Sequence, residues 1–107
     1  MIRIGLFAAL VTACTSSSST GIIASDLSCP SDSTLTYENF GATFLTENCL
    51  SCHASKQTPT LTTQAAVQAS RSAIISAAVL SAAMPQGGSL STDERELLGE
   101  WLTCGAP

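Results

Sequence analysis

The chain has 107 residues, enough for one small domain, and a formal net charge of −4 from four Lys and Arg against eight Asp and Glu. Cations this sparse do not form the basic patch that holds a phosphate backbone, so we expect no nucleic-acid partner. Hydrophobic residues make up 45% of the chain, but fifteen of them are Ala. The core is therefore thin, and a staple such as a disulfide, a metal or a cofactor is expected.

The first residues have the pattern of an export signal. Arg3 precedes the apolar run IGLFAALV and the small residues TAC, and eight apolar residues are too few for a bilayer span of about 20. VTAC resembles the bacterial lipobox, which implies that residues 1–13 are cleaved and that Cys14 carries lipid. The implied location is the periplasmic side of a bacterial membrane, with the outer membrane favoured over the inner. An ordinary secretory peptide is the alternative.

Residues 14–33 contain the Ser/Thr-rich stretch TSSSSTGIIASDLS, which has no helical or strand periodicity. Such a segment is typical of a flexible tether, and about 14 residues of random coil reach roughly 20 Å on average. We therefore expect a tether at 14–33 and a folded domain at 34–107.

A helix is predicted directly before the cysteine motif. Its apolar residues recur at the spacing i, i+3, i+4, i+7 and i+8, which places them on one helical face. This face must pack on another element. Its residues are Tyr37, Phe40, Gly41, Phe44 and Leu45.

Residues 49–53 read CLSCH, the CxxCH pattern of c-type haem attachment. Cys49 and Cys52 are nearly one helical turn apart, so both thiols can reach vinyl groups on one edge of a porphyrin. His53, the only histidine, is then carried beneath the ring, where a neutral imidazole nitrogen can ligate iron. Chance would place this pattern in a chain of such composition with odds of roughly 0.002.

Three other interpretations of the cysteine pair remain open. A dithiol redox motif usually begins a helix after a strand, and no strand alternation precedes residue 49. A zinc site needs four ligands; Cys29 and Cys104 could join, but the ligand pairs of a zinc ribbon are missing. A structural disulfide between Cys49 and Cys52 is the third.

Two further helices are predicted downstream. The Ala-rich stretch from about Thr63 to Ala83 lacks Gly and Pro, and one of its faces is expected to cover the haem. Arg71 is expected on its polar side as a solvated charge, with pairing to a haem propionate as the alternative. The last helix begins at a capping box and ends at Gly and Pro stop signals. Its residues are Ser91 and Glu94 in the box, Leu97, Leu98, Trp101 and Leu102 in the apolar stripe, and Gly105 and Pro107 at the stop.

With CxxCH in its first half and a lone Met-Pro well downstream, the chain resembles the class I cytochromes c. The resemblance implies an all-α fold of three to four helices around one covalent haem c, with Met84 as the second axial ligand opposite His53. Met84 as a core filler is the alternative. In this family the first and last helices cross at a small residue and an aromatic, which Gly41 and Trp101 match. Pro59 is the only candidate for the proline whose carbonyl orients the histidine.

Cys29 and Cys104 are then the cysteines without a role, and in an oxidising compartment we expect them to form a disulfide. The resemblance implies a one-electron carrier and not an enzyme, with transient redox-protein partners, a membrane contact through the lipid and no small-molecule substrate. A haem sensor or redox-enzyme subunit with an open iron position is the alternative function.

Overall fold

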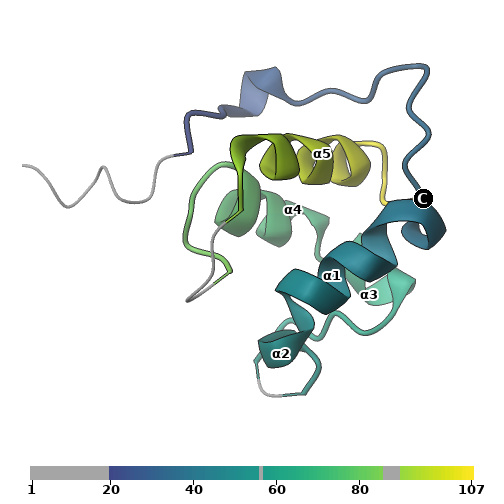
Figure 1. Cartoon of the computed structure of the whole chain (residues 1–107), viewed down its shortest axis with the longest axis vertical. Helices are drawn as coiled ribbons and strands as arrows, with labels where there is room; N and C mark the ends of the chain where they lie inside the picture. The colour runs from purple at the N-terminus through teal and green to yellow at the C-terminus, as the bar shows by residue number, and fades with distance from the viewer. Residues whose placement is uncertain (1–19, 56, 86–89) are drawn as a thin grey trace, which may run out of the picture.

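The computed structural model describes residues 20–55, 57–85 and 90–107, and these residues form helices and connecting segments (Figure 1). No strand occurs among them, so the all-α expectation is confirmed for the described part of the chain. In chain order the elements are a 3₁₀ turn η2 (Ala24–Asp26), a π-helical turn η3 (Tyr37–Gly41), α1 (Ala42–Asn48), α2 (Leu50–His53), α3 (Gln64–Ala69), α4 (Arg71–Ile74), a second π-helical turn η4 (Ile75–Val79) and α5 (Thr92–Thr103).

The first predicted helix is present as η3 and α1, which run on without a break. Thr36 caps it: the Thr36 hydroxyl accepts from the Asn39 N–H at 3.0 Å, and the Thr36 N–H donates to Asn39 Oδ1 at 2.8 Å. The helix ends at Cys49, whose backbone angles of φ −127° and ψ −36° are not helical. The chain therefore bends at the first cysteine of CLSCH before α2 begins.

The predicted helix at 63–83 is present in three pieces, and it ends earlier than expected. Thr63 caps α3 by accepting from the Ala66 N–H at 3.1 Å, and Ser70 interrupts the helix with φ −105° and ψ 12°. Its last regular element, η4, ends at Val79. The Arg95 guanidinium donates a hydrogen bond to the carbonyl of Ala78 at 2.6 Å. This carbonyl therefore has a partner without a further helical turn.

The last helix, α5, begins at the predicted capping box. Ser91 Oγ accepts from the Glu94 N–H at 3.0 Å, and the Ser91 N–H donates to Glu94 Oε1 at 2.8 Å. The predicted stripe is wrong at Leu97, which is 44% exposed. Leu98, Trp101 and Leu102 are buried as predicted, and Arg95 and Gly99 complete the buried face of α5.

The first and last helices meet at Gly41 and Trp101. A Cβ atom at Gly41 would overlap the Cζ2 and Cη2 atoms of the Trp101 ring, so the missing side chain allows the two helices their close approach. The ring is fully buried, and Phe40 meets it edge to face with 5.8 Å between ring centroids. This crossing fixes where α1 delivers the cysteine motif.

Residues 20–33, which the sequence analysis assigned to the tether, lie along α5 in the structure (Figure 1). Ile22 is buried, and Thr20 Oγ1 donates to the carbonyl of Val79 at 2.6 Å. Cys29 is joined to Cys104 in the expected disulfide. The described part of the predicted tether therefore packs with the helical domain, while residues 1–13, Cys14 and 15–19 lie outside the described residues.

Candidate functional site

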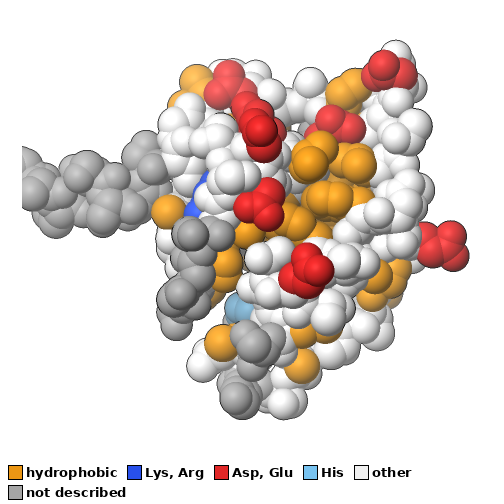
Figure 2. Space-filling view, viewed as in Figure 1, with side chains coloured by type: hydrophobic (Ala, Val, Ile, Leu, Met, Phe, Trp, Pro, Cys, Tyr) orange, Lys and Arg blue, Asp and Glu red, His pale blue; other side chains and the backbone are white. Residues whose placement is uncertain are grey.

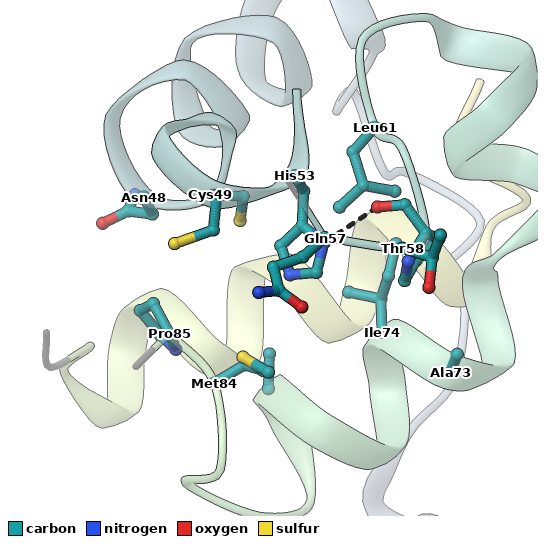
Figure 3. Close-up of a pocket in the computed structure, with 13 residues that line it drawn as sticks. Asn48, Cys49, His53, Gln57, Thr58, Leu61, Ala73, Ile74, Met84 and Pro85 are labelled. Carbon is teal, nitrogen blue, oxygen red and sulfur yellow. Dashed lines mark hydrogen bonds between the residues drawn. The ribbon is translucent and has the colours of Figure 1, made fainter. Parts of the chain in front are cut away.

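A pocket lies between α2 with its following loop on one side and α4, η4 and the Met84–Pro85 segment on the other (Figure 3). Cys49, Cys52, His53 and Met84 all line it, although Met84 follows His53 by 31 positions. The structure thus brings the expected thioether and axial donors to one cavity. The remaining lining residues are Asn48, Gln57, Thr58, Pro59, Leu61, Ala73, Ile74, Ala78 and Pro85.

The bend at Cys49 sets the direction of the motif. Within α2, the N–H groups of Cys52 and His53 both donate to the Cys49 carbonyl, at 3.2 and 3.0 Å. This single turn keeps the two cysteines and the histidine together at one wall. In Figure 3 the Cys49 sulfur and the His53 ring both extend from the CLSCH motif toward the pocket, and the Met84 side chain approaches from the opposite segment. Cys49 and Cys52 do not form a disulfide with each other in the structure, in contrast to the third interpretation.

The ring of His53 is oriented by the carbonyl of Pro59, which lies 2.8 Å from Nδ1. Because a carbonyl only accepts, Nδ1 carries the proton, and in the neutral imidazole the lone pair is then on Nε2. Two backbone hydrogen bonds hold the loop that supplies this carbonyl: Gln57 N–H to Cys52 O at 2.9 Å and Leu61 N–H to His53 O at 2.8 Å. A neutral imidazole with its Nδ1–H held by a fixed acceptor is the usual state of a metal-ligating histidine.

Burial raises the pKa of the Cys49 thiol from 9.0 to about 11. The nucleophilic cysteine of a dithiol oxidoreductase needs the opposite shift, because the thiolate is the reacting species. This disfavours the dithiol interpretation of CLSCH. A thioether sulfur carries no charge, so the apolar surroundings that penalise a Cys49 thiolate suit a covalently attached haem.

The zinc interpretation loses two of the ligands it would need, because Cys29 and Cys104 are bonded to each other and neither lines the pocket. The described residues also contain no group of three or more His, Cys, Asp and Glu side chains placed to hold a metal ion. The cysteine motif therefore offers one imidazole and two sulfur atoms, and among the described lining residues the only further sulfur donor is the Met84 thioether.

The donor set fits a c-type haem, and the cavity accommodates it only in part. The pocket opens to solvent and has a volume of about 190 Å³, below the roughly 300–1,000 Å³ of most cofactor sites. A group of porphyrin size therefore fits either with part of its edge outside the cavity or with an outward shift of the Met84 segment. Apolar side chains such as Leu61 and Ile74 face the space between the donors.

Among the described residues that line this pocket, none carries a charged carboxylate, ammonium or guanidinium group. Figure 2 shows Asp and Glu side chains spread over one face of the molecule, whereas the described lining residues include no Asp, Glu, Lys or Arg. Arg71, considered above as a partner of a haem propionate, does not line the pocket; its side chain is exposed and donates to the carbonyls of Gln68 and Leu102, at 3.2 and 3.3 Å.

Sequence reasoning missed one residue next to the site, Arg95. It is 6% exposed, and its Nη1 donates to the carbonyls of Ala78 at 2.6 Å and of Met84 at 3.2 Å. A signal was present, because Arg95 lies three and seven positions before Leu98 and Leu102, on the apolar side of α5.

Comparisons with protein-family models, with curated proteins and with solved structures found no match to this chain. None of the described helices has the length and hydropathy needed to cross a membrane. The function must therefore be inferred from the chemistry of the chain's own residues.

Proposed function

We propose that this chain is a one-electron carrier that holds a single haem c, with thioether bonds to Cys49 and Cys52 and with His53 and Met84 as axial ligands. One observation carries the proposal: the CxxCH donors and the only methionine downstream of them line one pocket, from segments far apart in sequence. The hydrogen bond from His53 Nδ1 to Pro59 supports it, since it leaves Nε2 as the donor nitrogen.

The haem would supply the one-electron couple of its iron. The chain's residues would then orient the iron ligands and set the reduction potential of that couple. Pro59 holds the imidazole at Nδ1, and a methionine thioether opposite an imidazole favours the ferrous state and raises the reduction potential. The described lining residues include no Asp, Glu, Lys or Arg. Such a lining suits electron transfer better than acid–base chemistry on a substrate.

The same proposal includes an exported location, with a lipid on Cys14 and transient docking to other redox proteins. The bond between Cys29 and Cys104 supports export, because disulfides persist in oxidising compartments such as the bacterial periplasm. Small, weak interfaces suit a carrier that must exchange partners quickly. The acidic balance of the chain favours a partner with a basic docking surface.

Covalent haem is tested directly on protein produced together with the haem-attachment machinery. We expect a pyridine haemochrome spectrum after denaturation and the mass of one haem on the peptide that contains Cys49 and Cys52. The control is the double variant Cys49→Ser/Cys52→Ser, which should carry no covalent haem. If the wild-type peptide has no added haem mass, the proposed function is wrong.

Axial ligation is tested with carbon monoxide added to the reduced protein. Wild-type protein should bind it poorly, because Met84 occupies the sixth position, and Met84→Ala should bind it readily. If wild-type protein bound carbon monoxide as readily as the variant, the iron would have an open position, and the sensor or enzyme-subunit function would replace the carrier.

A further inference from the structure

Both backbone polar groups of Met84 are held by hydrogen bonds. Its N–H donates to the carbonyl of Ala77 at 2.8 Å, which closes the turn that follows η4. Its carbonyl accepts from Arg95 Nη1 at 3.2 Å. The position of Met84 is therefore set by one contact within its own segment and by one contact from α5.

Arg95 is an unusual residue to find in the interior of so small a domain. Its guanidinium keeps its charge at all accessible pH values, and a buried charge is costly unless hydrogen bonds compensate it. Carbonyl oxygens at the end of η4 and just after it provide that compensation, since Nη1 lies 2.6 Å from Ala78 O and 3.4 Å from Ser81 O. The last carbonyls of a helix lack helical partners and carry partial negative charge, so a cation is favourable there.

The helix that carries Arg95 is itself fixed to the rest of the domain. Trp101, two turns further along α5, packs against Gly41 of the helix that leads into CLSCH, and Cys104 at its end is bonded to Cys29. Arg95 therefore connects the Met84 segment to the same framework that positions His53.

Resting on the proposed His53/Met84 ligation, we propose that Arg95 is a positioning residue, which holds the backbone of Met84 so that its thioether stays on the iron against competing ligands. Without Arg95, the Met84 carbonyl loses its hydrogen bond from α5. The carbonyls of Ala78 and Ser81 lose theirs as well. The fraction of molecules with methionine off the iron then rises. An external ligand binds only those molecules, so its apparent dissociation constant falls as that fraction grows.

The test is a titration of the ferric protein with imidazole at fixed pH. Arg95→Leu should bind imidazole at least about tenfold more tightly than wild type, a change of about 1.4 kcal/mol. Arg71→Leu is the matched control, because Arg71 also donates to backbone carbonyls but lies away from Met84; its affinity should stay within about twofold of wild type. If Arg95→Leu does not fold, Arg95→Gln replaces it and should bind at least about threefold more tightly.

A double-variant cycle separates positioning from general loosening of the pocket. In the Met84→Ala background no methionine competes, so adding Arg95→Leu should change imidazole affinity by less than about twofold. A tenfold effect in that background would overturn the proposal, and so would an unchanged affinity in the single variant. If Met84→Ala alone did not strengthen imidazole binding, methionine ligation itself would be wrong. The proposal on Arg95 would then fall with it, as it would if no covalent haem were found.

Discussion

Replacing Gly41 with Ala should destabilise this protein, although the same change favours most helices by about 1 kcal/mol. The reason is the Trp101 ring, which an added Cβ would overlap at Cζ2 and Cη2. The ring is held by its surroundings: it is fully buried, its Nε1–H donates to the Pro107 carbonyl at 3.3 Å, and the Phe40 ring packs against it in a T-shaped arrangement.

The magnitude follows from these opposing terms. Adding a methylene to a close-packed interior costs about 1–3 kcal/mol of stability. Because the added Cβ would overlap an aromatic ring that is fixed in place, we expect a cost of about 3 kcal/mol or more. After about 1 kcal/mol of helix propensity is regained, the net loss at Gly41 is about 2 kcal/mol. For a domain of this size, each kcal/mol lowers the melting temperature by about 4–8 °C, so we expect a decrease of about 8–16 °C.

Thermal unfolding of the haem-loaded protein, followed by far-ultraviolet circular dichroism, measures this loss. Gly99→Ala is the matched control in α5: its Cβ would meet Cδ2 of Leu27 at 2.9 Å and Cγ1 of Val79 at 3.2 Å. Leu27 Cδ2 is the far end of a flexible side chain that can shift, so the cost should be smaller than at Gly41. In a Trp101→Phe background the overlapped ring atoms are absent, and Gly41→Ala should be neutral or stabilising. A Gly41→Ala protein that melts at or above the wild-type temperature would refute the close approach.

Three further results are expected. In haem-free protein, burial raises the pKa of Cys49 from 9.0 to about 11 and makes its thiolate scarce. Alkylation of Cys49 by iodoacetamide near neutral pH should therefore be about 100-fold slower in the folded protein than in urea, and the difference should become smaller as the pH approaches 11. Equal rates in the two conditions would contradict the burial. Replacing both Cys29 and Cys104 with Ser should lower the free energy of unfolding by about 4–5 kcal/mol in the chain-entropy model, measured by urea titration; an unchanged value would show that the cross-link does not act on the unfolded chain. Cys14→Ser should move the protein from the membrane fraction to the soluble periplasmic fraction with an unaltered haem spectrum, whereas retention in the membrane fraction would count against the lipid anchor.

The helices were predictable where their signals are local. The capping box at Ser91 and Glu94 and the apolar face that includes Gly41 depend on neighbours three or four residues away, and both are present in the structure. The end of η4 was not predictable in this way, because the residue that takes its carbonyls, Arg95, lies beyond a connection of more than ten residues. Leu97 was misplaced for a similar reason. The buried side of α5 includes Arg95, whose hydrogen bonds to the carbonyls of Ala78 and Met84 are long-range contacts that the sequence pattern does not show.

In the candidate site, too, local features could be predicted from the sequence and long-range contacts could not. The spacing of CLSCH limits which residues could meet one porphyrin edge, so the motif alone was enough to predict Cys49, Cys52 and His53 as candidate site residues. The meeting of Met84 with His53 in one pocket could not, since it depends on the turn closed by the Met84 N–H and the Ala77 carbonyl. For Met84 the resemblance to class I cytochromes c supplied the expectation. For residues 20–33 polar composition suggested a tether, and the apolar contact of Ile22 outweighed it.

Two of the segments that build the pocket are fastened to α5, as is the stretch at residues 20–33, and this compensates for a thin core. The helix before CLSCH packs on it through Gly41 and Trp101, and the segment of Met84 is held from it by Arg95. Residues 20–33 are bonded to its end through Cys29 and Cys104. Few large apolar side chains are then needed at the site itself, because its geometry follows from the register of one helix. A substitution that shifts α5 along its axis should therefore disturb both sides of the pocket together, which a loosely packed loop site would not do.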